Sequence, residues 1–379
     1  MTERELREAL RAVPADEDAR GRALQVACAA YREREPVRPR RRWAPALALA
    51  ACALAAVLIA ASLNAPGDAV ARWVRQVLGA GHPDPKPALV RVPGGGRLLV
   101  SSADGAWAVA ADGSRRRLGD YAGVSWSPRG LFVVGWRGGE LVAMEPSGRV
   151  HWSLARPGRI TAARWAPGDG YRVAYLSGRT LRVVNGDGTG DRPLAAAAAV
   201  APSWRAGRDY VLAYADPRGR VRVVNVDTGA QLSRTPALPR VRHLAWSPDG
   251  RRLAIVTGRR VLVLDRTGSP RREHRVPRGT VVDAVSWSPA GRLAEVRRGS
   301  RTSKVVVDGR AVFTGSGRFG SVAWSPSGRR LLVPWPAADQ WLFVDADSDR
   351  ATAVANIARQ FARGPARQAF PDAVEWCCG

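Results

Sequence analysis

The side chains in this sequence that could perform chemistry are scattered along the chain. Its four histidines, His82, His151, His243 and His274, have no acid or metal-ligand partner at a fixed spacing. The Gly-x-Ser-x-Gly motif that presents a nucleophilic serine is absent from the sequence. We therefore predict no catalytic residue and no enzymatic activity; the alternative is a lyase or hydrolase site assembled from loops.

Two acidic stretches could be taken for metal sites. Residues 185–191 (NGDGTGD) are similar to the start of a calcium loop, but the twelfth position is Ala196, where a bidentate glutamate is needed. Asp345, Asp347 and Asp349 alternate in a comparable way. Hairpin turns explain both stretches, so we predict no metal and no cofactor.

The four cysteines do not form a recognisable framework. Cys28 and Cys52 lie before or within a hydrophobic segment, and Cys377 and Cys378 are adjacent. No CxxC pair and no Cys/His zinc spacing is present. The adjacent pair could form a vicinal disulfide or cross-link to another chain, but we expect free thiols.

The strongest pattern is a recurring Trp-Ser-Pro-x-Gly motif. Its copies begin at Trp126, Trp246, Trp287 and Trp324, looser copies begin at Trp165 and Trp204, and the spacing of about 40 residues is that of four-stranded propeller blades. Serine, proline and glycine at these places fit a type I turn, and the tryptophan offers a flat face for packing between blades. The recurring residues, to which we assign a structural role, are Trp126, Pro128, Gly130, Trp165, Pro167, Trp204, Trp246, Pro248, Gly250, Trp287, Pro289, Gly291, Trp324, Pro326 and Gly328.

Apolar runs between the motifs predict an all-β architecture. Each unit carries two such runs separated by glycine-bearing turns, as in residues 253–256 and 261–264. Counting a further unit at residues 90–110 gives seven blades, with six as the alternative. Residues 351–362 read as a helix, and residues 373–376 read as a strand that completes the first blade and closes the ring.

These motifs resemble those of a known family. Trp246-Ser247-Pro248-Asp249-Gly250, followed by residues 252–256 and 261–265, resembles the repeat of TolB-like, WD-repeat-like β-propellers. The resemblance covers roughly residues 88–345, and the copies at Trp165 and Trp204 depart from it. It implies a bacterial, membrane-anchored binding platform of the cell envelope, or the propeller part of a larger enzyme.

A candidate transmembrane helix precedes the repeats. Residues 44–63 are free of charge, and twenty residues in a helix are long enough to cross a bilayer core. Arg38, Arg40, Arg41 and Arg42 lie just before this segment, so the positive-inside rule places residues 1–43, a basic helical segment, in the cytoplasm. We expect an uncleaved signal anchor, because a charge-rich stretch of some forty residues before the apolar run is too long for a cleaved signal peptide.

Residues 64–87 connect this segment to the repeats. Residues 68–80 show the spacing of an amphipathic helix, which could lie on the outer membrane surface or pack on the propeller. Residues 81–87 (GHPDPKP) form a proline-rich spacer. The predicted propeller domain, with its C-terminal helix and closing strand, therefore spans residues 88–379.

The charge of the chain suggests what kind of partner it binds. The net charge is +26 and nearly all of the excess is arginine, which is also typical of a GC-rich genome. We predict a single-pass plasma-membrane protein whose extracytoplasmic propeller binds a protein or an anionic envelope polymer; nucleic acid is not expected. The alternative is an anti-sigma-like regulator that senses through the propeller and engages a cytoplasmic partner through residues 1–42.

Overall fold

A computed structural model describes residue 86 and residues 88–168, 171–364 and 369–378. The chain divides into two compact units, Met1–Arg72 and Trp73–Gly379, and all described residues belong to the second. The predicted cytoplasmic segment (1–43), transmembrane helix (44–63) and juxtamembrane helix therefore lie outside the described residues. Among the residues that are described, no helix is both long enough and apolar enough to span a membrane.

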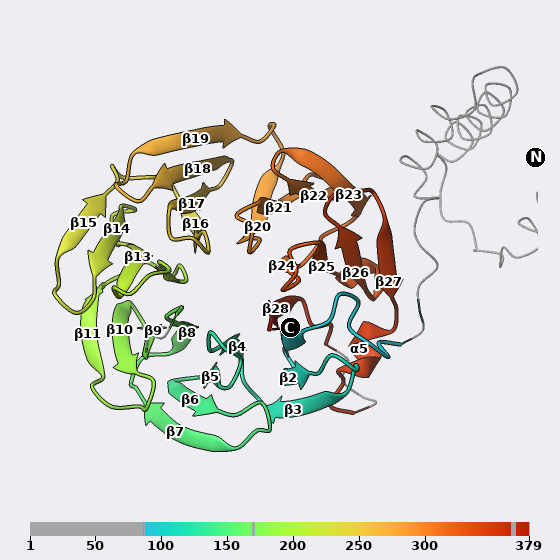
Figure 1. Cartoon of the computed structure of the whole chain (residues 1–379), viewed down its shortest axis with the longest axis horizontal. Helices are drawn as coiled ribbons and strands as arrows, with labels where there is room; N and C mark the ends of the chain where they lie inside the picture. The colour runs from blue at the N-terminus through green and yellow to red at the C-terminus, as the bar shows by residue number, and fades with distance from the viewer. Residues whose placement is uncertain (1–85, 87, 169–170, 365–368, 379) are drawn as a thin grey trace, which may run out of the picture. The chain divides into compact units, whose positions relative to one another are not determined.

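The second unit is a ring of seven four-stranded antiparallel sheets, which confirms the seven-bladed propeller (Figure 1). Blade 1 consists of β28 (Ala373–Cys377), β1 (Arg97–Ser102), β2 (Gly105–Val109) and β3 (Arg115–Gly119). Blade 2 consists of β4 (Gly123–Trp126), β5 (Val133–Arg137), β6 (Glu140–Met144) and β7 (Val150–Ala155). Blade 3 consists of β8 (Ile160–Trp165), β9 (Arg172–Ser177), β10 (Thr180–Asn185) and β11 (Arg192–Ala196).

The remaining blades repeat this order along the chain. Blade 4 consists of β12 (Ser203–Trp204), β13 (Val211–Ala215), β14 (Val221–Asn225) and β15 (Gln231–Arg234). Blade 5 consists of β16 (Val241–Trp246), β17 (Arg252–Thr257), β18 (Arg260–Asp265) and β19 (Pro270–Arg275). Blade 6 consists of β20 (Val281–Trp287), β21 (Leu293–Arg298), β22 (Thr302–Val307) and β23 (Arg310–Ser316). Blade 7 consists of β24 (Ala323–Trp324), β25 (Arg330–Trp335), β26 (Gln340–Asp345) and β27 (Ala351–Val354).

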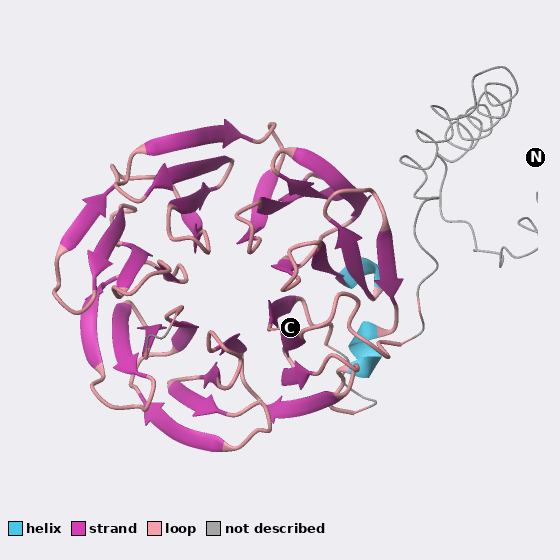
Figure 2. Ribbon diagram, in the orientation of Figure 1, coloured by secondary structure: helices cyan, strands magenta, loops and turns pink. Residues whose placement is uncertain are grey.

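Within each blade we name the strands A to D from the centre of the ring outwards (Figure 2). Strands B and C are buried almost throughout, because neighbouring blades cover both faces of the sheet, and their sequences are accordingly nearly continuous apolar runs. The outermost strand D is largely exposed and carries charge, as in β3 (RRRLG) and β19 (PRREHR). The apolar clusters of the core therefore lie between adjacent blades.

The ring is closed by the end of the chain, as the sequence predicts. Strand β28 pairs with β1, with Trp376 opposite Leu98 and Val374 opposite Val100. This pairing supplies blade 1 with its innermost strand and leaves no open sheet edge at the junction.

The helix predicted for residues 351–362 is wrong in its first half. Residues 351–354 form β27 and pair with β26, because blade 7 needs an outer strand. Only a short helix, α5 (Ile357–Gln360), follows, and a single turn of 3-10 helix (Pro336–Ala338) lies between β25 and β26. The buried Phe361 packs on Trp341 with ring centroids 4.9 Å apart, so this segment covers the outside of blades 7 and 1.

Candidate interaction faces

Because the strands of each blade are antiparallel, successive connections alternate between the two faces of the ring. We call the side that carries the A–B and C–D turns the turn face, and the side that carries the B–C hairpins and the D–A connections the hairpin face. All copies of the tryptophan motif lie on the turn face, since each tryptophan ends a strand A.

The motif residues shape the A–B turns. In the four regular copies the glycine amide donates to the serine carbonyl at 2.8–2.9 Å, and the serine hydroxyl accepts the amide of the residue that begins or directly precedes strand B at 2.9–3.0 Å. Gly130, Gly250, Gly291 and Gly328 have φ between 65° and 76°, which side chains disfavour. The serines are almost fully buried, so these groups do not face a ligand.

The tryptophans join neighbouring blades. The indole N–H of Trp204, Trp287 and Trp324 donates to the carbonyl of the residue that precedes the tryptophan of the previous blade, at 2.9–3.0 Å. Trp376 of the closing strand donates to the Gly95 carbonyl at 2.8 Å. The indole nitrogens of Trp126, Trp165 and Trp246 are buried and have no partner among the described residues.

Several arginines on the turn face also act between blades, which the sequence analysis missed. An arginine between the end of strand A and the start of strand B stacks over the tryptophan of the next blade. The pairs and their distances to the ring centroid are Arg97 over Trp126 (5.2 Å), Arg205 over Trp246 (5.9 Å), Arg252 over Trp287 (4.6 Å) and Arg292 over Trp324 (5.9 Å). The arginine that closely follows the turn glycine in many copies was the available signal. A share of the arginine excess therefore covers aromatic rings.

The hairpin face carries exposed arginines in its hairpins and connections. None of these side chains forms an ion pair with a described residue. They are Arg159, Arg240, Arg278 and Arg318 in the D–A connections, Arg179, Arg218, Arg259 and Arg301 in the B–C hairpins, and Arg242 near the start of β16. Blades 3 to 6 and the connection into blade 7 thus present guanidinium groups to solvent.

Most of the nearby carboxylates already have partners. Asp216 is 4% exposed and accepts Arg222 at 3.0 Å, Asp283 accepts Arg298 at 2.5 Å, and Glu140 accepts Arg137 at 2.7 Å. The exposed arginines are therefore the uncompensated charges of this face.

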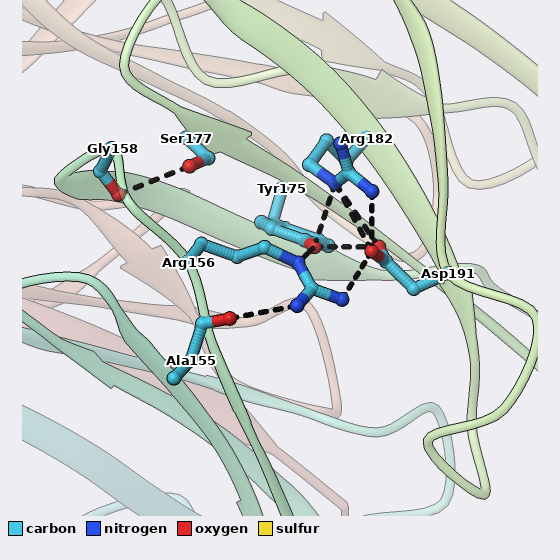
Figure 3. A network of polar contacts seen from close by, with 7 residues as sticks. All are labelled: Ala155, Arg156, Gly158, Tyr175, Ser177, Arg182 and Asp191. Carbon is cyan, nitrogen blue, oxygen red and sulfur yellow. Dashed lines mark hydrogen bonds and ion pairs between the residues drawn. The ribbon is translucent and has the colours of Figure 1, made fainter.

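A polar cluster joins blades 2 and 3 below the hairpin face (Figure 3). The Asp191 carboxylate accepts hydrogen bonds from Arg156, from Arg182 at 2.5 Å and from the Tyr175 hydroxyl at 2.5 Å. Burial opposes ionisation of Asp191, but these three donors outweigh it and lower its pKa. Burial and the Asp191 carboxylate raise the pKa of Tyr175. Because Tyr175 is fully buried, a substrate cannot reach its hydroxyl, and the cluster joins the two blades.

A second polar cluster joins blades 5 and 6. Glu295 lies 3.0 Å from the His274 ring nitrogen Nε2 and accepts Arg297 at 2.8 Å, and its side chain is only 3% exposed. Burial opposes the ionisation of Glu295, whereas His274 and Arg297 favour it, and its pKa is lowered. This contact gives His274 an acidic partner 21 residues away in sequence, which no spacing rule could indicate.

The described residues include two of the three remaining histidines and the calcium-like stretch. His151 contacts Glu145 at 3.2 Å, burial lowers the pKa of His243, and His82 lies outside the described residues. In the calcium-like stretch, Asp187 accepts the amide of Thr189 within a hairpin turn. Within the described ranges, no group of three or more His, Cys, Asp or Glu side chains is arranged to hold a metal ion.

The structure describes only two of the four cysteines and none of the four arginines that precede the predicted transmembrane helix. The structure joins Cys377 and Cys378 in a vicinal disulfide, so the expectation of free thiols is wrong for this pair. Cys28 and Cys52 lie outside the described residues, as do Arg38, Arg40, Arg41 and Arg42.

Three solved WD-repeat propellers have a fold similar to that of this chain. The β-propeller domain of Myceliophteria thermophila Cps50 (Swd1) has a TM-score of 0.51 at 13% identity, covering 64% of this chain and 94% of that one. Kluyveromyces lactis Hsv2 has a TM-score of 0.53 at 14% identity, covering 69% and 94%. A chain of the Mitotic Checkpoint Complex has a TM-score of 0.50 at 20% identity, covering 61% and 74%.

These likenesses support a WD-repeat-like propeller at the level of the fold. No protein-family model and no curated protein matches the chain.

Proposed function

We propose that this protein is a binding platform without enzymatic activity, and that its hairpin face binds a protein with an acidic surface. The observation that carries the proposal is the set of exposed arginines on that face that form no ion pair with a described residue. Propellers present loops around a channel mouth, where the partner of a rigid ring is expected to contact it.

The charges favour an acidic partner for a physical reason. Guanidinium groups held by short hairpins on a rigid ring lose little conformational freedom when they bind carboxylates, and bidentate pairs add specificity. Like charges clustered on one face also accelerate the association of an oppositely charged protein. Both effects weaken as salt screens the field.

The experiment measures binding of the full-length chain, in non-ionic detergent, to an immobilised acidic fraction of envelope proteins. The variant Arg159→Gln/Arg179→Gln removes two charges from the hairpin face of blade 3, where the Gly178 amide donates to the Arg159 carbonyl at 2.8 Å. The control Arg251→Gln/Arg266→Gln removes two exposed charges from the turn face of blade 5. We expect about a tenfold loss of affinity and a weaker salt dependence only for the first variant, since a tenfold change corresponds to roughly 1.4 kcal/mol.

Equal effects of the two variants would refute specific use of the hairpin face. Retention by teichoic or other anionic polymers instead of proteins would assign the face to an envelope polymer. Turnover of a bound component by the purified chain would refute the absence of enzymatic activity.

We further propose that the chain is a bacterial, TolB-like envelope protein with an extracytoplasmic propeller, anchored in the plasma membrane by residues 44–63. The charge-free segment behind Arg38, Arg40, Arg41 and Arg42 supports this topology. Reporter fusions at residues 40 and 85 test it. We expect the periplasmic or extracellular reporter to be active only at residue 85, and activity at residue 40 would reverse the orientation.

The alternative proposal is that the propeller signals across the membrane through residues 1–42. The helical spacing and the charge of this segment support a contact with a cytoplasmic regulator. Pulldown with residues 1–42 tests it, and recovery of no transcription factor or kinase would count against signalling.

A further inference from the structure

The seven blades differ at the residue that ends strand C and begins the turn to strand D. In blades 2, 3, 4, 5 and 7 this residue carries a carboxylate or an amide, whereas in blade 1 it is Ala110. These residues are Glu145, Asn185, Asn225, Asp265 and Asp345; blade 6 has a shorter turn, in which the Asp308 amide donates to the Leu293 carbonyl. The turn hydrogen bonds agree: Ala110 donates to the Ser114 carbonyl as Asp265 donates to the Ser269 carbonyl.

The missing side chain lies beside an arginine. Arg97 starts strand B of blade 1 directly across from Ala110, because Leu98 pairs with Val109. In blade 6 the equivalent arginine, Arg292, donates to Asp308 at 3.2 Å. Across from Arg97 there is only a methyl group.

A second arginine faces the same space. Arg116 of β3 pairs with Ala108, and Ala108 packs toward Trp126 of blade 2. Alternation along the strands places Arg97, Ala108 and Arg116 on the same side of the sheet. Arg97 and Arg116 are two strands and two residues apart, about 12 Å at the backbone, and the residues between them on the same side of the middle strand are alanines.

These residues enclose a cavity of about 350 Å³ between blades 1 and 2 on the turn face. The apolar part of its lining includes Ala108, Ala110, Trp126 and Pro146. The guanidinium of Arg97 stacks over Trp126 at 5.2 Å. A guanidinium that stacks on a ring can still donate hydrogen bonds from its in-plane N–H groups.

The described residues supply no anion to either arginine. Neither Arg97 nor Arg116 forms an ion pair or a side-chain hydrogen bond with them. The two nearest carboxylates are already bound: Asp112 accepts the amide and the hydroxyl of Ser114, and Glu145 accepts Arg149 and Ser147.

We propose that this cavity is a binding site for a small organic anion. A carboxylate or phosphate lies between Arg97 and Arg116, and the apolar or planar body that carries it packs against Trp126 and Pro146. The anion takes the place that a carboxylate of the chain itself holds beside Arg292 in blade 6. The anionic group belongs either to a free small molecule or to an acidic side chain of a partner. The site is on the opposite face from the arginines of the proposed function and is independent of it.

The test measures binding of phenyl phosphate to the full-length chain in non-ionic detergent by calorimetry. Arg116→Gln is expected to weaken binding by about tenfold, since one charge-assisted pair is lost. Ala110→Asp places a carboxylate beside Arg97 and is expected to abolish binding, whereas Ala110→Asn, of the same size, is expected to reduce it far less. Arg251→Gln, which removes an exposed charge of the same face, is the control and is expected to leave binding unchanged.

Thermal unfolding of each variant verifies that the ring is intact, and polar side chains at this position in five of the other blades predict that Ala110→Asp folds. A different outcome is that a glutamate-containing peptide binds and phenyl phosphate does not. If peptide binding then depends on Arg116 and Ala110 in the same way, the site belongs to an acidic side chain of a partner. Benzyl alcohol is the uncharged comparison. The proposal is overturned if benzyl alcohol binds as well as phenyl phosphate, if no probe saturates the wild-type chain, or if Ala110→Asp binds like the wild type.

Discussion

Replacing Asp191 by asparagine is the most informative test of how the blades are joined. The Asp191 side chain is 7% exposed, and Arg156 and Arg182, which both donate to it, are 23% and 21% exposed. Removing one partner of a buried pair costs about 3–5 kcal/mol because the other charge is left unpaired. The two arginines are in part solvated, so we expect a loss of about 2–4 kcal/mol in the free energy of unfolding at pH 7.

The pH dependence gives this prediction a second, independent readout. The pKa of Asp191 is lowered in the folded chain, so its contribution to stability is present above the unfolded pKa of about 3.9. That contribution is lost as the pH falls through the folded pKa. The difference between the wild type and Asp191→Asn is therefore expected to be full at pH 7 and to shrink below about pH 4.

The assay is urea denaturation of the full-length chain in non-ionic detergent, followed by hydrogen exchange of the amides in β9 and β10. Asp227→Asn is the matched control, because Asp227 is 43% exposed and lies 3.5 Å from Arg172, a pair worth less than about 1 kcal/mol. Equal losses for the two variants, or a loss for Asp191→Asn that is the same at pH 7 and pH 3, would refute the reasoning.

Two further predictions concern the motif itself. Trp287→Phe loses the hydrogen bond to the previous blade and is expected to cost about 1 kcal/mol more in unfolding free energy than Trp246→Phe, whose indole nitrogen has no partner among the described residues; equal urea midpoints would contradict this. Gly250→Ala would place a Cβ 2.3 Å from a backbone carbonyl oxygen at φ 65° and is expected to cost at least about 2 kcal/mol, whereas Gly258→Ala, at φ 48° with no atom within 4 Å, should cost about 1 kcal/mol. Thermal unfolding of both glycine variants checks the order, which the opposite ranking would overturn.

The tertiary structure corrected the sequence-based prediction where the conformation of a segment depends on its neighbours in the ring. Residues 351–362 have helical composition, yet residues 351–354 complete blade 7 as a strand because β26 offers an unpaired edge. Local propensity is weak compared with the hydrogen bonds and burial that an edge provides. Likewise, the adjacency of Cys377 and Cys378 left several pairings open, and the structure joins the two in a disulfide.

The sequence by itself predicted a propeller of seven blades, with six as the alternative, and a closing strand at residues 373–376. It could do so because the tryptophan motif acts locally: proline and glycine set the turn, serine bonds the next strand, and alternating burial marks the strands. These signals need no knowledge of distant residues.

Only the tertiary structure decided which charged groups meet. Asp191 finds Arg156 and Arg97 finds Trp126 across the boundary between two blades, and Ala110 matters only because Arg97 lies across from it. These partners are separated by tens of residues in one chain but lie within a few ångströms once the ring closes. Electrostatic contacts depend on those distances and on burial, and neither can be read from residue types and their spacing.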